Sequence, residues 1–255
     1  MRSLSLSTRR KLAANLFVAA VLVAWAVAAL RLPGYVLPDP LTVIRQALAF
    51  FTSPKLAGHI GASIYHVAAA LVLAFVVGTA LAVTSHYLRV TRLLIGRLAA
   101  FLNSFSSIGW ALLAILWFGL NDESVIFVIG VVILPIFMIN MQAGLDRRDA
   151  ELIEMTASFT RSWPRGFFSV VLPSLYPFML ATTRLAFGVA WKVALTAELF
   201  GGNSGFGFVV NIARQDIDTP RIFAVIAIMI AISFLADRFL FAPLQRALTR
   251  HYADA

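Results

Sequence analysis

The stretch SVIFVIGVVILPIFMINMQAG, Ser124 to Gly144, carries no formal charge. It has about 20 residues, and a helix of that length crosses the hydrocarbon core of a bilayer, which is about 30 Å thick. A transmembrane β-strand would need only about ten residues of alternating polarity, and this stretch does not alternate. The stretch therefore predicts a membrane-spanning helix.

The composition extends this interpretation to the whole chain. Of the 255 residues, 60% are hydrophobic and 13% are charged, and the mean hydropathy is +0.87. Soluble domains are charged at about a quarter of their residues. We therefore predict an all-α integral membrane protein with one transmembrane domain over residues 1–255. Its six predicted spans are 12–32, 59–86, 93–118, 124–144, 174–200 and 222–244.

The distribution of Lys and Arg predicts the orientation of these spans. The first apolar block follows a basic start, but it exceeds the about 7–15 residues of a signal peptide, so we expect an uncleaved helix. With both termini cytoplasmic, most basic residues fall in inner segments, as the positive-inside rule requires. A short amphipathic run, Leu41 to Phe51, is predicted to lie at the outer surface. The inner basic residues are Arg2, Arg9, Arg10, Lys11, Arg89, Arg92, Arg97, Arg147, Arg148, Arg161, Arg165, Arg238, Arg246 and Arg250.

Several function classes receive no support from the sequence. The formal charge of +9 comes from short clusters between apolar blocks, not from a basic tract of the kind that binds nucleic acid. There is no cysteine, and the four histidines have no metal-ligand spacing. We expect neither a nucleic-acid partner nor a metal site.

A polar patch, NSFSSIGW, interrupts the third predicted span at Asn103 to Trp110. Two interpretations stay open. Small residues such as Ser106 and Ser107 let helices pack closely, or they line a passage, because irregular backbone at membrane depth needs protein or water around it.

A long polar stretch, ELIEMTASFTRSWPRGFFSVVLPSLYP, lies between the fourth and fifth spans at Glu151 to Pro177. On the predicted topology, residues 145–173 form a cytoplasmic loop, far longer than the about 4–6 residues that join two helices. Its first part predicts an acidic, partly apolar helix, whereas helices that lie on lipid are rich in Lys and Arg. We interpret it as a docking element for a soluble protein.

This loop resembles the EAA loop of permease subunits of bacterial ABC importers. Glu154 stands at the family's Glu, Met155 and Thr156 replace its two alanines, and Thr160 replaces its glycine. The resemblance implies a coupling helix that docks on an ATPase. The residues that it assigns to coupling are Glu151, Glu154, Met155, Thr156, Phe159, Thr160, Val170, Leu172 and Pro173.

Other segments resemble the nitrate, sulfonate and taurine branch of these permeases. They are LPDPLTVIRQAL (37–48), LWFGLNDESVIFVI (116–129), LPSLYPFMLATTRLAFGVAWKVALTAELFG (172–201) and GFGFVVNIAR (205–214).

The resemblance implies a multi-pass protein of the bacterial inner membrane that works as a homodimer. Its implied partners are two ATP-binding subunits and an extracytoplasmic solute-binding protein, with membrane lipid around the spans. The chain has no G-x-x-x-x-G-K-[ST] phosphate loop, so we expect no enzymatic activity and no cofactor in this chain. ATP-Mg would bind the partner ATPase. The function implied is ATP-driven import of a small anionic solute.

Three charged residues fall inside the fifth predicted span: Arg184, Lys192 and Glu198. A charge at the bilayer centre costs about 2.5–3.5 kcal/mol, so each is expected to face protein or water. They line an anion pathway, or they form structural pairs, for example of Lys192 with Asp122, Glu123 or Asp237. Glu198, nearer the outer end, is an alternative contact for the binding protein.

The sequence leaves two further function classes to consider. A stand-alone secondary transporter or channel would use Lys192 and Glu198 as ion or proton sites. An intramembrane hydrolase is disfavoured, because His66 has no acid beside it in the sequence and no nucleophile is evident. The glycine-rich segment Gly201 to Phe208 is expected to be a tight outer loop that gates the solute's entrance.

Overall fold

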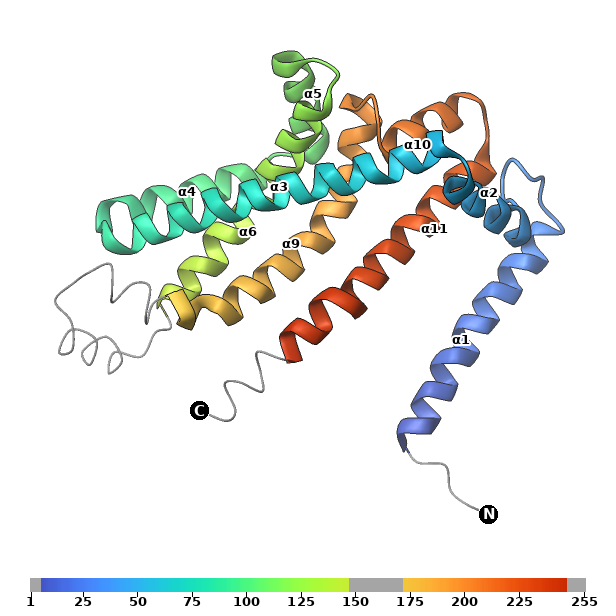
Figure 1. The fold of residues 1–255 in the computed structure, drawn as a ribbon, viewed down its shortest axis with the longest axis horizontal. Coiled ribbons are helices and arrows are strands. Elements are labelled where there is room, and N and C mark those ends of the chain that lie inside the picture. The colour runs from blue at the N-terminus through green and yellow to red at the C-terminus, as the bar shows by residue number, and fades with distance from the viewer. Residues whose placement is uncertain (1–5, 147–171, 247–255) are drawn as a thin grey trace. The chain divides into compact units, whose positions relative to one another are not determined.

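The computed structural model describes residues 6–146 and 172–246, and every regular element in these ranges is a helix (Figure 1). The prediction of an all-α protein is confirmed for this part of the chain. In order, the elements are α1 (Leu6–Ala29), α2 (Pro40–Thr52), α3 (Pro54–Tyr87), α4 (Arg89–Ser104), α5 (Ser107–Phe118), α6 (Asp122–Asp146), α9 (Leu172–Gly201), α10 (Phe206–Gln215), α11 (Thr219–Ala236) and the π-helix η2 (Asp237–Phe241).

Four helical segments among the described residues are long and apolar enough to cross a membrane. They are Pro54–His86, Asp122–Asp146, Leu175–Gly201 and Thr219–Arg246. A fifth span is present if α4 and α5 together form one. The apolar part of α1, Asn15–Ala29, is shorter than these segments. Four to five of the six predicted spans are thus shown.

The third predicted span is a bent pair of helices. The segments Thr91–Ser104 and Ser107–Phe118 meet at 94°, and the break falls in the polar patch that the sequence marks. Phe105 is extended there (φ −99°, ψ 135°), and the Ser106 hydroxyl accepts a hydrogen bond from the Ile108 N–H (3.4 Å). A serine in this position caps the new helix, because it satisfies an N–H that has no partner within the helix.

The described chain forms two compact units, and the first comprises Met1–Gly58 and Val209–Ile228. Within it, the Trp25 indole donates to the carbonyl of Pro38 (3.1 Å), and its ring lies 5.9 Å from that of Phe223. The amphipathic run predicted from the sequence is the short helix α2, which buries Val43 and Phe50. These contacts fix the segment that follows α1.

The second unit comprises His59–Phe208 and Met229–Ala255, and α6 is at its centre. Helix α6 contacts α4, α5 and α9. Met138 packs with Ile95 and Ala99 of α4, while Met141 packs with Ala82 of α3 and Leu175 of α9. Helix α6 buries residues on several sides, among them Ile129, Ile133 and Phe137, although Ile139 stays exposed. This arrangement brings the N-terminal parts of α3 and α6 close to the C-terminal end of α9.

Candidate functional site

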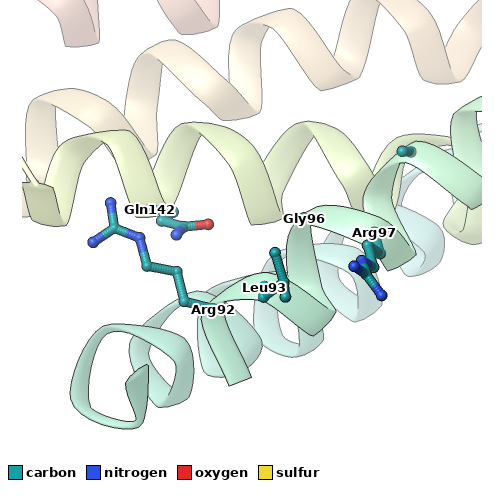
Figure 2. Close-up of a pocket in the computed structure, with 6 residues that line it drawn as sticks. Arg92, Leu93, Gly96, Arg97 and Gln142 are labelled. Carbon is teal, nitrogen blue, oxygen red and sulfur yellow. The ribbon is translucent and has the colours of Figure 1, made fainter. Parts of the chain in front are cut away.

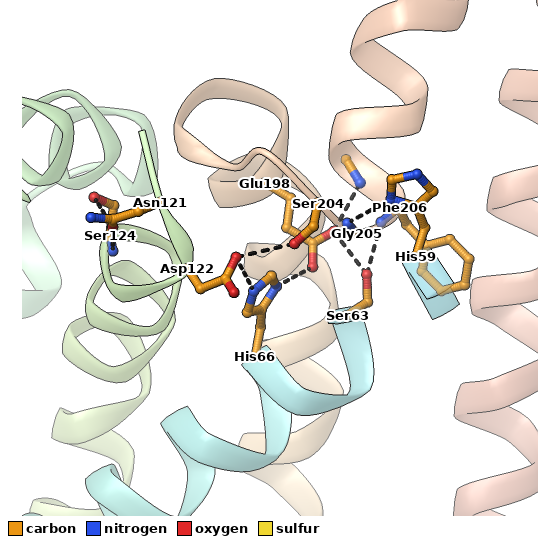
Figure 3. Close-up of polar contacts among 11 residues, drawn as sticks. His59, Ser63, His66, Asn121, Asp122, Ser124, Glu198, Ser204, Gly205 and Phe206 are labelled. Carbon is orange, nitrogen blue, oxygen red and sulfur yellow. Dashed lines mark hydrogen bonds and ion pairs between the residues drawn. The ribbon is translucent and has the colours of Figure 1, made fainter. Parts of the chain in front are cut away.

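Polar side chains from three long helices meet in an otherwise apolar part of the second unit (Figure 3). Helix α3 contributes Ser63 and His66, α6 contributes Asp122, and α9 contributes Glu198. The Glu198 side chain is 1% exposed and that of His66 is 0% exposed, whereas that of Asp122 is 49% exposed. The cluster therefore extends from a buried acid to an acid that is half open.

The Glu198 carboxylate accepts hydrogen bonds from α3, which is distant in sequence, and from the segment that follows α9. Its Oε2 accepts from the Ser63 hydroxyl (2.9 Å) and from the backbone N–H of Gly207 (2.8 Å). Its Oε1 lies 2.9 Å from Nδ1 of His66. A buried carboxylate is tolerated only when it is paired and hydrogen-bonded, and these contacts meet that requirement.

The His66 imidazole lies between two carboxyl groups, because its Nε2 is 3.2 Å from Oδ1 of Asp122. Nδ1 of the ring lies at hydrogen-bond distance from Glu198, whereas Nε2 makes only an ion-pair contact with Asp122. The ring thus links α3 to both α9 and α6.

The segment after α9 packs directly on this cluster, and glycine makes the close approach possible. Gly205 has φ +94°, and a Cβ at this position would collide with the carboxylate of Glu198. A Cβ at Gly207 would collide with the backbone of α9 at Leu195. The glycines of this segment, which suggested a tight outer loop, allow it to lie against Glu198.

Further hydrogen bonds hold the same segment from the other helices. The N–H of Phe206 donates to the Ser63 hydroxyl (2.8 Å), and the N–H of Gly205 donates to Nδ1 of His59 (3.2 Å). The Ser204 hydroxyl donates to Asp122 (3.1 Å). Residues 204–207 are thus fastened to α3, α6 and α9 at once.

The sequence contains a signal for this cluster that the spacing of histidines alone did not reveal. At 100° per residue, Ser63 lies about 40° and His66 about 20° from His59 around α3. Three polar residues therefore share one face of an apolar span, and such a face must meet polar partners. His66 has no acid beside it in sequence, but the fold brings Glu198 and Asp122 to it.

The arrangement does not provide a nucleophile. Ser63 is fully buried, and its hydroxyl donates to Glu198 instead of to an imidazole. A serine nucleophile needs a base that takes its proton and access to a substrate. The geometry favours a structural anchor for the segment after α9.

Arg184 is engaged within the second unit. Its guanidinium donates to both oxygens of Asp237, from Nε (2.6 Å) and from Nη2 (2.9 Å), and its Nη1 donates to Gln245 (2.6 Å). Asp237 opens the π-helix η2. Of the two roles predicted for Arg184, the geometry therefore agrees with a structural pair.

Lys192 is exposed on α9. Among the described residues, no ion pair includes it. Two of the acids predicted as possible partners of Lys192 pair with other residues. Asp237 pairs with Arg184, and Asp122 contacts His66. The structure thus separates the two basic residues of α9 into one that is paired and one that is open.

The remaining predicted site residues fall into three groups. Ser106 caps α5 and Ser107 begins it, at the bend of the third span. Leu172 and Pro173 begin α9. The other predicted coupling residues lie outside the described residues: Glu151, Glu154, Met155, Thr156, Phe159, Thr160 and Val170.

We predict that Glu198→Ala lowers the melting temperature of the purified protein in detergent by about 6–20 °C. Breaking a buried pair costs about 3–5 kcal/mol, and about 2–4 °C are lost per kcal/mol in a chain of this size. Glu198→Gln should cost less, because the amide can still accept from Gly207 and donate to His66.

The matched control is Glu123→Ala, since Glu123 is an exposed acid on α6. Surface substitutions usually change stability by less than about 0.5 kcal/mol, so the control should keep the parent's melting temperature. An unchanged melting temperature in Glu198→Ala would contradict the anchoring role.

Comparisons with known proteins agree with this architecture. Residues 70–248 match the family described as the inner membrane component of binding-protein-dependent transport systems. A protein of Bacillus subtilis (strain 168) named as an aliphatic sulfonates transport permease is 31% identical over 80% of this chain and 74% of its own length.

Two other relatives carry different solute names. The taurine transport system permease protein of Escherichia coli (strain K12) is 27% identical over 90% of this chain and 86% of its own length. The bicarbonate transport system permease protein of Synechococcus elongatus is 26% identical over 74% of this chain and 68% of its own length.

The family match covers more than half of the chain and includes α6, α9 and, from the polar cluster, Asp122 and Glu198, whereas Ser63 and His66 precede it. In this family the permease is the multi-pass membrane component, and ATP is hydrolysed by a separate subunit. The chain belongs to the inner-membrane components of binding-protein-dependent transport systems and is a permease subunit of an ABC importer.

Proposed function

We propose that this permease forms a translocation pathway for a small anionic solute of the sulfonate, taurine or nitrate type. The observation that carries the proposal is the exposed, unpaired Lys192 in the described part of a membrane-spanning helix. The named relatives support it, because the sulfonate, taurine and bicarbonate in their names all carry an anionic group.

The depth of Lys192 within α9 supports the proposal. It lies nine residues before Gly201, about 14 Å along the axis from the end of α9. A lysine at such depth costs about 2.5–3.5 kcal/mol when it faces lipid. It is therefore expected to face water or another subunit, and a ring of basic residues in a pore favours anions.

The bend of the third span supports a passage in the same unit. Ser106 is exposed and Ser107 half-buried at the break, and broken backbone within a membrane requires protein or water around it. We propose that these serines line the pathway with Lys192. Arg184 and Glu198, also predicted for the pathway, are held by contacts within the chain and would act by positioning α9 and the segment 202–207.

We further propose a chain of six spans with both termini cytoplasmic, α1 being the first. It would act as a homodimer with two ATP-binding subunits, which bind ATP-Mg, and an extracytoplasmic solute-binding protein. The cytoplasmic loop 145–173 would transmit ATP-driven movement through Glu154 and Thr160. For ATP to shift the spans between inward- and outward-facing states, the partners must bind the two states with different affinities.

The absence of cysteine makes the topology directly testable. In intact spheroplasts, a membrane-impermeant maleimide should label Lys55→Cys and Asp216→Cys. It should label Ser3→Cys and Ala255→Cys only after the membrane is permeabilised. The unsubstituted chain is the control, since it offers no thiol. Labelling of Ser3→Cys in intact spheroplasts would show that the N-terminus is outside and would contradict the six-span arrangement.

The pathway proposal predicts a specific effect of Lys192. In proteoliposomes that contain the permease, its ATPase and the binding protein, Lys192→Gln should lower ATP-driven uptake of taurine or ethanesulfonate by about tenfold, which corresponds to about 1.4 kcal/mol. Lys192→Arg should retain most of the uptake, because it keeps the positive charge.

Lys55→Gln is the matched control, because it removes the same charge from an exposed position at the start of α3. Recovery of the intact complex is measured for each variant. If Lys192→Gln assembles normally and transports both anions at the parent rate, Lys192 does not line the pathway.

A further inference from the structure

A cavity of about 570 Å³ lies on the surface between α4 and α6, away from the polar cluster. Five of its lining residues come from α4 and one, Gln142, comes from α6 (Figure 2). In the view of Figure 2, Arg92 and Arg97 lie on either side of Leu93. The other lining residues, Gly96 and Ala100, are small.

The helical periodicity explains how α4 builds this cavity. Measured from Arg92 at 100° per residue, Gly96 lies at about 40°, Ala100 at about 80°, Leu93 at about 100° and Arg97 at about 140°. The two arginines therefore border a strip of small and apolar side chains. At Gly96, a Cβ would have no atom within 4 Å, so the floor of the strip is open.

The other faces of α4 place the cavity beside lipid. One face carries Ile95 and Ala99, which are buried against Met138. The face beyond Arg97, at about 180–240° from Arg92, exposes Leu94 (59%), Leu98 (39%) and Phe101 (63%). In a membrane-spanning helix such a face meets acyl chains, so the basic cavity continues into a lipid-facing surface.

The charge of the cavity is positive. Arg92 forms an ion pair with Asp146, whose other oxygen lies 3.7 Å from His86. Within the described chain, Arg97 has no ion-pair partner. The cavity thus has two guanidinium groups, of which only that of Arg92 is paired with a carboxylate, and the amide of Gln142 adds a further donor at its edge.

We propose that this cavity binds an anionic phospholipid. The headgroup phosphate would lie between Arg92 and Arg97, with Gln142 as a second donor, and an acyl chain would cover Gly96 and Ala100. Guanidinium groups suit phosphate oxygens, and basic pockets between membrane helices bind anionic headgroups. A soluble anion would gain nothing from the apolar strip between the arginines.

The depth of the arginines fits this occupant, given the orientation proposed above. Arg92 and Arg97 lie three and eight residues into α4, about 4.5 and 12 Å from its start. With that start at the cytoplasmic surface, the two side chains reach the headgroup and glycerol levels of the inner leaflet. The proposal concerns a lipid that stays in place, and it does not depend on which solute is transported.

Native mass spectrometry of the purified permease tests the proposal. The probe is an equimolar mixture of phosphatidylglycerol and phosphatidylcholine with identical acyl chains. The parent should retain phosphatidylglycerol preferentially. Arg97→Gln should lower this retention about fivefold, the factor expected for one basic residue at an anionic surface. Gly96→Leu should lower it by filling the strip.

Matched controls separate the cavity from general effects. Gly61→Leu places the same side chain at another helical glycine whose Cβ meets nothing within 4 Å, and Arg45→Gln removes an exposed arginine from α2. Both should retain phosphatidylglycerol as the parent does. The melting temperatures of all variants are to be measured, and similar values would confirm that the folds are comparable.

Three results would overturn the proposal. The first is equal retention of the two lipids by the parent. The second is displacement of phosphatidylglycerol by millimolar inorganic phosphate, which would identify a site for free anions. The third is a change of oligomeric mass in Gly96→Leu with lipid retention intact, which would identify the strip as a contact between two copies of the chain.

Discussion

The buried carboxylate of Glu198 is the interaction on which the second unit depends. It satisfies a hydroxyl of α3, an imidazole of α3 and a backbone N–H of α10. If the carboxylate of Glu198 were removed and no water replaced it, each of these groups would lose a partner at a cost of about 1–3 kcal/mol. Helix α9 is thereby fixed to α3 at the end where the chain turns into residues 202–207, and the orientation of Lys192 on α9 follows from the same constraint.

Local properties of the sequence were sufficient to predict the all-helical class and four to five of the spans. Length and hydropathy decide whether a segment such as 124–144 can span a bilayer, and the interruption at Asn103 to Trp110 is visible as a polar patch. The glycines at 205 and 207 are visible too. Their role, to let the chain approach Glu198 closely, becomes apparent only in the folded chain. The first span was predicted at 12–32, whereas the apolar segment of α1 is shorter.

Pairing between distant residues could not be predicted in the same way. His66 and Glu198 are 132 positions apart, and no local rule selects one acid over another. The shared face of His59, Ser63 and His66 shows only that α3 needs polar neighbours. Arg184 and Lys192 illustrate the same limit, because both are basic residues of one span and only the fold shows that Asp237 neutralises the first.

We propose that energy for transport enters through the loop 145–173 of this permease. The most direct measurement is ATP hydrolysis in membranes that contain the permease and its ATP-binding subunit, with complex recovery followed by pull-down. Glu154→Lys should abolish assembly or lower the activity severalfold, while Asp216→Lys, with the same change of charge, should leave both intact. A Glu154→Lys complex that assembles and hydrolyses ATP like the parent would contradict the account.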